Sequence, residues 1–380
     1  MTGVHRLTGV VRPYAWGSRT VLAGLQGRPV PTDEPEAELW LGAHPGDPST
    51  VGGQSLATLI DEDPKGQLGS EVVEAFGPRL PYLMKLLAAE SPLSLQAHPD
   101  ADYARTAFAA QEADPSLPKN YTDAYHKPEM LVAITPFEAL CGFRSPDEAA
   151  ADLAALDLPA LAPVVAALRG GALGDAVRML LTWPAEQRAD LVSSAVARAE
   201  GGLVPRLAEH YPGDPGVLVA LLLNHVTLAP GEAIWMPAGN LHAYLRGAGV
   251  EIMAASDNVL RGGLTPKRVD VDELMRVLRF EVLREPIFPA TPVQPGVTTW
   301  RVPVGEFALF RVELGPGRPP VTLPAAGPRI ALGVEGETFV AGPHGTPTEL
   351  TPGTAAYAPA ETGELTLAGT GVVFVAAVPS

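Results

Sequence analysis

Proline and glycine break this chain into short segments. The 380 residues include 40 prolines and 39 glycines, spread along the sequence and not gathered in one low-complexity tract. Each of them ends or bends a regular element, because proline lacks a backbone N–H and glycine tolerates positive φ. Many of the segments between them are rich in β-branched and aromatic residues. The pattern predicts a protein built mainly of short β-strands joined by many turns.

Composition and charge narrow the class of protein. With 46% hydrophobic and 18% charged residues, the chain can build a core, and its length predicts two or three domains of about 150 residues each. The 27 Lys and Arg against 43 Asp and Glu give a net charge of −16, which disfavours binding to nucleic acid or to an anionic membrane. A small phosphorylated ligand stays possible, because only the charges of its pocket matter.

Cysteine usage and hydropathy indicate where such a chain works. The single cysteine, Cys141, excludes an intrachain disulfide and fits a reducing compartment. A lone thiol between a strand and a helical segment is expected to fill apolar space and not to act as a nucleophile. No apolar run has the length of a signal peptide core or a membrane span, so we expect a cytoplasmic protein.

One long segment departs from the β pattern. Ser145-Pro146-Asp147-Glu148 offers an N-cap, a proline for the first helical position and a capping-box glutamate. Ala-, Leu- and Arg-rich stretches then continue to about His210, interrupted by glycine pairs and a proline that separate three or four short helices. We therefore predict an all-helical subdomain at 145–215. Elsewhere we expect strands at 129–135, 226–235, 307–314 and 371–378, and helices at 100–113 and 271–278.

A weak internal echo suggests two similar β-barrels. Gly231-x5-Pro237 recurs as Gly353-x5-Pro359, each preceded by a proline and apolar residues, but no histidine follows the second proline. Two barrels, of which only one keeps a set of ligands, would explain the echo. The alternative is coincidence, because a glycine and a proline at this spacing are common.

The first copy belongs to a longer motif. Gly231-x5-Pro237-x-Gly239-x2-His242 resembles the second motif of the cupin family of small β-barrels, in which a Pro/Gly turn aims a metal-binding histidine into the barrel mouth. The alternative is a turn histidine hydrogen-bonded to the backbone. The asparagine that often closes the motif is replaced by Arg246.

Two further segments carry polar side chains on predicted strands. Strand alternation places Ser94, Gln96 and His98 on one face, and they must be solvated, hydrogen-bonded or bound to a metal. The same alternation points Lys127 and Glu129 the same way, at the start of a run that is predicted to be buried. The alternative for this second pair is an ordinary ion pair on the surface.

These segments together offer a metal site. Gln96, His98, Glu129 and His242 would supply two imidazoles, a carboxylate and an amide oxygen, which suit zinc or a neighbouring divalent metal. One carboxylate against a divalent ion leaves a net positive charge, which favours stabilisation of an oxyanion. The hypothesis requires three separated segments to meet.

The chain resembles the type I mannose-6-phosphate isomerases, also called phosphomannose isomerases. The blocks that carry this resemblance span about residues 10–280. They are Tyr14-Ala-Trp-Gly-Ser18, Ala37-Glu-Leu-Trp-Leu-Gly-Ala-His44-Pro45, Pro81-Tyr-Leu-Met-Lys85-Leu-Leu, residues 93–100 and 126–130, and Ser256-Asp-Asn-Val-Leu-Arg261-Gly-Gly-Leu-Thr-Pro-Lys267. At residues 122–125 the chain is less polar than its relatives often are. This departure bears on the shape of the pocket rim and not on the metal ligands.

The resemblance implies a mainly β fold with an α-helical insertion: two cupin-like β-barrels of jelly-roll type and an all-helical subdomain. Residues 1–144 and 216–290 would form the catalytic barrel, 145–215 the insertion, and 291–380 a second barrel without metal ligands. Independently of the resemblance, we expect the β-rich tail from about Val297 to pack against the catalytic barrel and to shape the site entrance. The resemblance also implies one zinc ion on Gln96, His98, Glu129 and His242, with Arg261 as the catalytic arginine.

The implied reaction interconverts mannose 6-phosphate and fructose 6-phosphate through an enediol or enediolate, feeding mannose metabolism and the supply of GDP-mannose. Lys127, His126 and Glu251 are the candidates for the proton-transfer base, because burial or a neighbouring charge can move the pKa of each. The candidate phosphate contacts are Lys85, Ser94 and Lys267. We expect a monomer whose partner is a small hexose phosphate. A redox-metal cupin oxygenase and a sugar-phosphate-binding protein without turnover are the alternatives.

Overall fold

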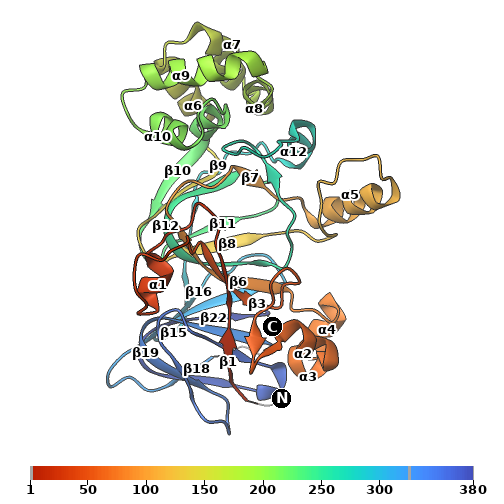
Figure 1. Cartoon of the computed structure of the whole chain (residues 1–380), viewed down its shortest axis with the longest axis vertical. Coiled ribbons are helices and arrows are strands. Elements are labelled where there is room, and N and C mark those ends of the chain that lie inside the picture. Colours follow the sequence, from red (N-terminus) through yellow and green to blue (C-terminus); the bar gives the residue numbers. More distant parts are fainter. Residues whose placement is uncertain (1–2, 324–326, 380) are drawn as a thin grey trace.

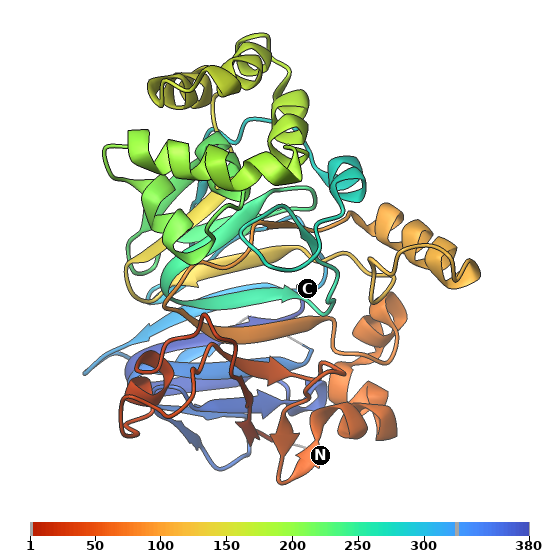
Figure 2. The same cartoon turned by 45° about the horizontal axis from the view of Figure 1, so that its top comes forward.

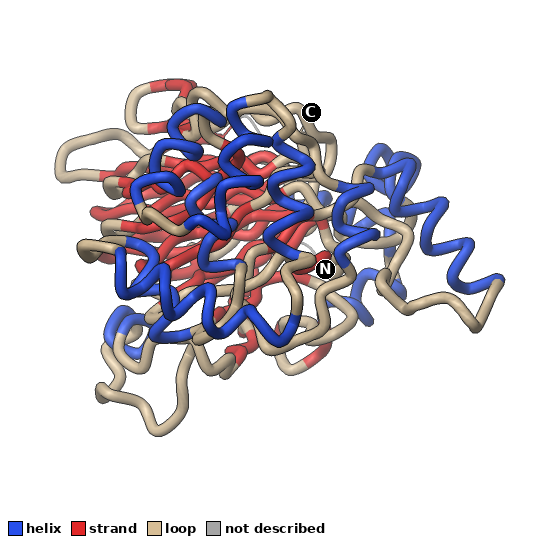
Figure 3. The backbone as a smooth tube through the Cα atoms, turned by 90° about the horizontal axis from the view of Figure 1, so that it is seen from above, coloured by secondary structure: helices blue, strands red, loops and turns tan. Residues whose placement is uncertain are grey.

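The computed structural model describes residues 3–323 and 327–379, and two large β-sheets form its centre. Two sheets lie one above the other, with a group of helices beyond the first sheet (Figure 1). Figure 3 shows the strands gathered in the middle and the helices around them. The predicted mainly β architecture is therefore confirmed.

The first sheet follows the order β14-β11-β8-β12-β6-β3-β2, and β7 and β9 also pair with β12, with β13 on β7 and β10 on β9. Its strands in the described part of the chain are β2 (Val10–Arg12), β3 (Glu38–Gly42), β6 (Tyr82–Ala89), β7 (Gln96–Ala97), β8 (Glu129–Ala133), β9 (Phe137–Phe143), β10 (Leu223–Leu228), β11 (Ala233–Met236), β12 (His242–Ala254), β13 (Leu260–Arg261) and β14 (Ile287–Phe288). The long strand β12 pairs antiparallel with β6, β7, β8 and β9, so it connects every segment that carries a predicted ligand.

The second sheet follows the order β15-β16-β17-β22-β19-β21-β1-β4-β5, with β18 on β22 and β20 on β19. Its strands are β1 (His5–Thr8), β4 (Thr50–Val51), β5 (Gln54–Ser55), β15 (Thr291–Gln294), β16 (Val297–Thr299), β17 (Ala308–Leu314), β18 (Val321–Leu323), β19 (Arg329–Ala341), β20 (Thr348–Leu350), β21 (Ala355–Ala358) and β22 (Leu365–Ala377).

The N-terminal strands correct the predicted division at residues 1–144. Strand β1 pairs with β21, and β4 pairs with β1, so both belong to the sheet of the C-terminal strands (Figure 2). The physical reason is that β1 covers the edge of β21 and buries Leu7, which is 3% exposed. Residues 5–8 and 50–55 therefore lie outside the first sheet.

The helical prediction is confirmed for the segment after Phe143. Its helices are α6 (Pro146–Ala155), α7 (Ala162–Arg169), α8 (Leu173–Leu181), α9 (Arg188–Arg198), α10 (Leu203–His210) and α11 (Gly216–Val219), with 3-10 turns η1 (Pro159–Leu161), η2 (Ala185–Gln187) and η3 (Ala220–Leu222). Helical structure continues past residue 215 because Pro215 begins a further short helix. Pro146 occupies the first turn of α6 as predicted, but the Ser145 side chain makes no capping hydrogen bond.

Outside this segment, the two predicted helices are α5 (Ala101–Ala113) and α12 (Val271–Val277). Four short helices near the N-terminus were not predicted, namely α1 (Val21–Leu25), α2 (Leu56–Glu62), α3 (Pro64–Leu68) and α4 (Ser70–Phe76). The 3-10 turn η4 (Ala360–Thr362) near the C-terminus was not predicted either. They are too short for a clear helical period in the sequence. None of the helices at 3–323 and 327–379 has the length and hydropathy of a membrane span.

The expected strand 226–235 is two strands, β10 and β11, because the chain turns at Gly231 with φ of 90°. Gly353 has φ of 74° in the same kind of turn, and a four-residue strand followed by a proline comes after each. The two copies of the sequence echo therefore have the same local structure, one in each sheet.

One hydrophobic core joins the two sheets. It contains Leu39 and Met84 of the first sheet together with Ile330 and Phe374 of the second. The Tyr82 hydroxyl also donates a hydrogen bond to the carbonyl of Pro328 at 3.1 Å. The sheets therefore hold each other through buried apolar contacts, which are the main source of folding free energy.

This shared core predicts the effect of truncating Phe374, which is 1% exposed and stacks on Trp300 at 6.4 Å. Phe374→Ala should lower the free energy of unfolding by about 3–5 kcal/mol, since it removes a buried ring and leaves a cavity. Guanidinium denaturation measures the change. The control, Leu117→Ala, truncates a side chain that is 42% exposed and should leave the midpoint almost unchanged. An equal shift in both variants would contradict a shared core.

Candidate active site

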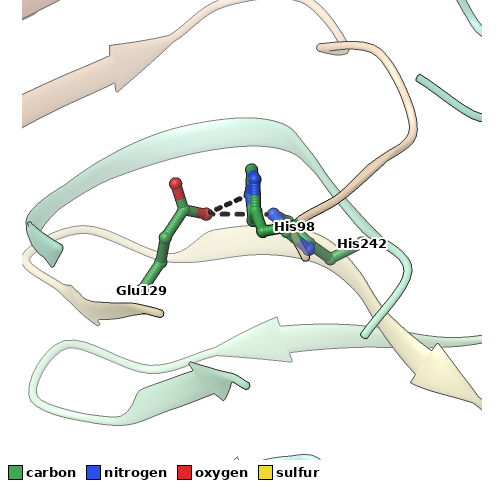
Figure 4. A group of neighbouring side chains, drawn as sticks. All are labelled: His98, Glu129 and His242. Atoms are coloured by element: carbon green, nitrogen blue, oxygen red, sulfur yellow. Dashed lines mark hydrogen bonds and ion pairs between the residues drawn. The ribbon is translucent and has the colours of Figure 1, made fainter. Parts of the chain in front are cut away.

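Three buried side chains meet at one end of the first sheet. His98, Glu129 and His242 each offer a ligand atom, and these atoms lie within 4.8 Å of one another (Figure 4). The Glu129 Oε2 atom lies 3.2 Å from His98 Nε2 and 3.1 Å from His242 Nε2. The prediction that separated segments converge is confirmed for these three residues.

Strand register explains the convergence. His242 on β12 pairs with Gln96 on β7, and Met253 of β12 pairs with Glu129 on β8. The N–H of Gly239 donates to the carbonyl of His98 at 2.8 Å, which ties the turn before His242 to the next ligand. The paired strands thereby bring the three segments to one place.

Gly239 explains why the turn motif contains a glycine at this point. Its φ is 77°, and a Cβ there would lie 2.7 Å from Arg279 Cγ and 2.8 Å from the carbonyl oxygen of Val277. A side chain would therefore be both strained and too close. The glycine is required by the geometry that aims His242 inward.

Backbone carbonyls orient both imidazoles. The Nδ1 atom of His98 lies 2.6 Å from the carbonyl oxygen of Asn258, and Nδ1 of His242 lies 3.1 Å from that of Asn240. A carbonyl only accepts, so each Nδ1 carries the proton and each Nε2 keeps its lone pair. Both lone pairs then face the carboxylate of Glu129.

This arrangement of acceptors fits a cation. Burial lowers the pKa of His98, which favours the neutral ring. Glu129 Oε2 lies near, yet His98 Nε2 is buried without a hydrogen bond. Two lone pairs and a carboxylate oxygen at such distances repel one another unless a positive charge lies between them. The cluster therefore has the chemistry of a divalent metal site with imidazoles held by outer hydrogen bonds.

Gln96 can supply a fourth ligand. Its amide Nε2 lies 3.3 Å from His242 Nε2, and the side chain is half-buried. Turning the amide by half a rotation exchanges its nitrogen and oxygen, which places the carbonyl oxygen beside the imidazole. The donor set is then two nitrogens and two oxygens, as zinc accepts.

Lys127 and Glu129 were predicted to lie on the same face of the strand, and they do so as a buried ion pair. Lys127 Nζ lies 2.9 Å from Glu129 Oε1, with the side chains 8% and 2% exposed. Burial alone would raise the pKa of Glu129, but the positive charge of Lys127 is the largest cause that holds it well below its usual value. The alternative of a surface ion pair is therefore wrong.

A second charged network lies on the same face of the sheet. Lys85 on β6 pairs in register with Glu251 on β12, and its Nζ lies 2.9 Å from Glu251 Oε2 and 3.6 Å from Glu38 Oε1. Burial alone would lower the pKa of Lys85, but Glu251 and Glu38 raise it above its usual value. Lys85 is therefore a buried cation held between two carboxylates.

Sequence reasoning missed Tyr244. Its hydroxyl donates to Glu251 Oε1 at 2.6 Å, and burial raises its pKa well above the usual value. Tyr244 shares the face of His242 two residues earlier, so strand alternation could have identified it. A register shift after Tyr244 changes the alternation and brings Glu251 to the same face, which no sequence pattern indicates.

Sequence reasoning also missed the side chain of Asn258, which is fully buried. Its Oδ1 accepts from the N–H of Thr122 at 2.8 Å, and its Nδ2 donates to the carbonyls of Asp123 and Tyr125, each at 2.8 Å. The backbone carbonyl of the same residue orients His98. Asn258 therefore links the loop at 122–125 to the cluster of His98, Glu129 and His242.

Arg261 lies beside the cluster. Strand β13 pairs with β7 so that Arg261 is opposite Gln96. The guanidinium is half-buried, burial lowers its pKa, and it makes no hydrogen bond or ion pair within residues 3–323 and 327–379. An unpaired, partly desolvated guanidinium is suited to bind an anion.

The remaining predicted residues lie in different surroundings. His126 Nε2 lies 2.6 Å from Glu306 Oε1. Ser94 is half-buried and Lys267 is exposed, and neither side chain makes a hydrogen bond or ion pair with the cluster in the described ranges. Cys141 is buried among apolar side chains, and burial raises its pKa to about 12, so the prediction of a packing role is confirmed.

The chain is similar in sequence to the proteins of one enzyme family. Residues 4–146 match the family model "Phosphomannose isomerase type I, catalytic domain". The mannose-6-phosphate isomerase of Escherichia coli is 35% identical over 97% of this chain and 98% of its own. The human enzyme is 34% identical over 82% of each chain.

Solved structures agree along the whole length. A point variant of phosphomannose isomerase from Salmonella typhimurium superposes with a TM-score of 0.92 and 32% identity over 100% of both chains. A zinc-bound mannose 6-phosphate isomerase gives a TM-score of 0.90 and 32% identity, covering 99% of this chain and 100% of its own.

The cluster predicts that zinc affinity falls when one of its side chains is removed. The purified protein, stripped and then titrated with zinc, should bind one equivalent, and His242→Ala should weaken binding at least about 100-fold, since it removes a ligand and not merely an outer partner. Calorimetry measures the affinity without reference to turnover. His225→Ala is the control, because His225 is partly exposed and pairs with Glu138 away from the cluster. Unchanged affinity in His242→Ala would contradict the site.

Proposed function

The chain belongs to the type I mannose-6-phosphate isomerase family, and from this premise we propose that it interconverts mannose 6-phosphate and fructose 6-phosphate with one zinc ion. The observation that carries the proposal is the buried cluster of His98, Glu129 and His242 beside Arg261, whose guanidinium has no partner among the described residues. An aldose-ketose isomerase must move a proton between C1 and C2 and stabilise an enediol or enediolate. These residues offer a metal site and a free cation for that purpose.

We propose His98, His242, Glu129 and Gln96 as the zinc ligands. The Nε2 atoms that both imidazoles direct at Glu129, the carboxylate between them and the adjacent Gln96 amide support this assignment. When bound, zinc supplies a Lewis acid that polarises or orients the sugar oxygens. The outer hydrogen bonds to the carbonyls of Asn258 and Asn240 would keep the rings in place.

Arg261 is proposed to stabilise negative charge on the reacting sugar oxygens. Its guanidinium is permanently charged, can hold two oxygens at once and carries no internal partner in the described chain. Such a preorganised cation stabilises charge that develops in the transition state more than charge in the ground state.

Lys127, His126 and Glu251 remain the candidates for proton transfer, and their partners differ. Lys127 is paired with Glu129, and His126 with Glu306. Glu251 accepts hydrogen bonds from Lys85 and Tyr244. A carboxylate can accept a proton directly, whereas a lysine ammonium must first lose one, so the surroundings favour Glu251 over Lys127 as the base.

Lys267 and Ser94 are the better candidates for the phosphate. The Lys267 ammonium is exposed and has no carboxylate partner in the described chain, whereas Lys85 is held by Glu251 and Glu38. A lysine already paired with two carboxylates gains little from a phosphate. We therefore propose that Lys85 positions Glu251 and that Lys267 contacts the phosphate, with the Ser94 hydroxyl as a second contact.

We further propose a division into two cupin-like barrels of jelly-roll type with a helical insertion. The equivalent turns at Gly231 and Gly353, one in each sheet, support it. The first barrel would comprise the strands of the first sheet, and the second would include β1, β4 and β5. We also propose a cytoplasmic monomer that acts on hexose phosphate and contributes to mannose metabolism and GDP-mannose supply.

Metal removal provides the first test. The purified protein should form fructose 6-phosphate from mannose 6-phosphate, lose this activity when a chelator removes the metal, and regain it with zinc. A coupled assay for fructose 6-phosphate measures the rate. Absence of turnover in a folded, zinc-loaded protein would contradict the proposed reaction and favour a binding protein. Iron-dependent oxygen uptake would favour an oxygenase.

The role of Arg261 predicts a separation of kcat from metal binding. Arg261→Ala should reduce kcat by about 10²–10³-fold, the size expected for loss of a charge-stabilising donor. Zinc content, measured by mass spectrometry, should stay at the wild-type value. Arg246→Ala is the control, because Arg246 is 69% exposed and pairs with Glu90 on the surface. Similar kcat values for the two variants would contradict the assignment.

A further inference from the structure

A carboxylate that lies just before β17 of the second sheet contacts the His126 segment, which leads into β8 of the first sheet. Glu306 lies two residues before β17, and its Oε1 lies 2.6 Å from Nε2 of His126. The side chains are 13% and 24% exposed, so water screens the pair only in part. His126 begins the segment that contains Lys127 and Glu129.

Glu306 is held in a fixed place. The next residue, Phe307, is 1% exposed and contacts the ring of Trp235 edge to face at 6.3 Å. Trp235 lies on β11 and pairs with Met130 of β8, the strand that carries Glu129. The backbone beside the Glu306 carboxylate is therefore anchored in the shared core next to the strand it serves.

A second contact holds the residue before His126. The guanidinium of Arg79 lies over the ring of Tyr125, 3.7 Å from its centroid, and the same arginine donates to the carbonyl of Phe76 at 3.2 Å. Burial would raise the pKa of Glu306, but His126 and Arg79 keep it below its usual value, so the carboxylate is charged. Tyr125 and His126 are thus fixed by Arg79 and Glu306 respectively.

The position of His126 determines how Lys127 enters the site. Pro128 fixes its own φ and disfavours helical backbone at Lys127, so the short path from His126 to Glu129 has little freedom. The carbonyl of Pro128 also accepts from the N–H of Ala254 at 3.1 Å. A shift of the His126 ring would therefore be transmitted to the Lys127 ammonium, 2.9 Å from Glu129.

We propose that Glu306 is a positioning residue for the isomerase reaction: the second sheet uses it to hold His126, and through His126 to place Lys127 beside the metal ligands. This inference rests on the proposed function and adds a role for the second sheet, whose described residues form no metal-binding group. In this role His126 supports the site as a hydrogen-bond partner of Glu306.

The test compares substitutions at both ends of the contact. Glu306→Ala should lower kcat about 10-fold with KM and zinc content close to wild type, because displacement by a fraction of an ångström affects positioning. Glu306→Gln should recover most of the rate, since its amide oxygen still accepts from Nε2. Adding Glu306→Ala to His126→Ala should cause no further loss, because the two residues act as one unit.

The control is Gln26→Ala, which removes the 3.0 Å hydrogen bond from α1 to the carbonyl of Gly353 without involving the His126 segment. It also breaks a contact with the second sheet, but kcat should not change. If Glu306→Ala lowers only the unfolding midpoint, or if its effect adds to that of His126→Ala, the contact is a structural link and the proposal is overturned.

A second measurement separates this proposal from the proposed reaction. If the wild-type protein forms no fructose 6-phosphate, the proposed function fails, and the side-chain nitrogen resonances of His126 and Lys127 decide the positioning role. Glu306→Ala should shift both resonances. A shift confined to His126, with that of Lys127 unchanged, would overturn the transmission from Glu306 to Lys127.

Discussion

The site depends on one buried carboxylate. Glu129 faces two imidazole nitrogens with one oxygen and the Lys127 ammonium with the other. Burial of an unpaired carboxylate would cost several kcal/mol, so this residue can remain charged inside the sheet only because the Lys127 ammonium, and a metal cation when one is bound, lie beside it. Its neighbours are accordingly fixed: both imidazoles present Nε2, and backbone carbonyls hold the opposite nitrogens. The strand register of β7, β8 and β12 supplies these positions.

The interior of the first sheet extends the same principle. The buried charges on this face occur in compensated groups, with Lys127 beside Glu129, and Lys85 between Glu251 and Glu38. Arg261 is the exception, because it has no partner in the described chain. A site that compensates its internal charges and leaves one guanidinium unpaired is preorganised for an anionic ligand. The networks around Glu129 and Glu251 provide rigidity, and in the proposed function Arg261 provides the charge that binds the anion.

Sequence reasoning succeeded where chemistry follows from local pattern. The Pro/Gly turn before His242, the shared face of Lys127 and Glu129, and the helical segment after Arg144 are all local features. It failed where long-range pairing decides. Nothing local indicates that β1 completes the second sheet, or that a register shift after Tyr244 brings Glu251 to the metal-bearing face. The contacts of Asn258 likewise depend on a loop more than a hundred residues away.

The two sheets share a local design but differ in what they contribute. The turns at Gly231 and Gly353 have the same form, yet only the first is followed by a histidine that faces a carboxylate. The second sheet buries apolar side chains against the first, and beside this core Phe307 anchors the backbone of Glu306. A contact in the core fixes the position of the adjacent backbone, because packed rings have few alternative arrangements. A carboxylate next to such an anchor is therefore well suited to hold His126. In our proposal, packing gives the second sheet, whose described residues form no metal-binding group, a part in the chemistry of its neighbour.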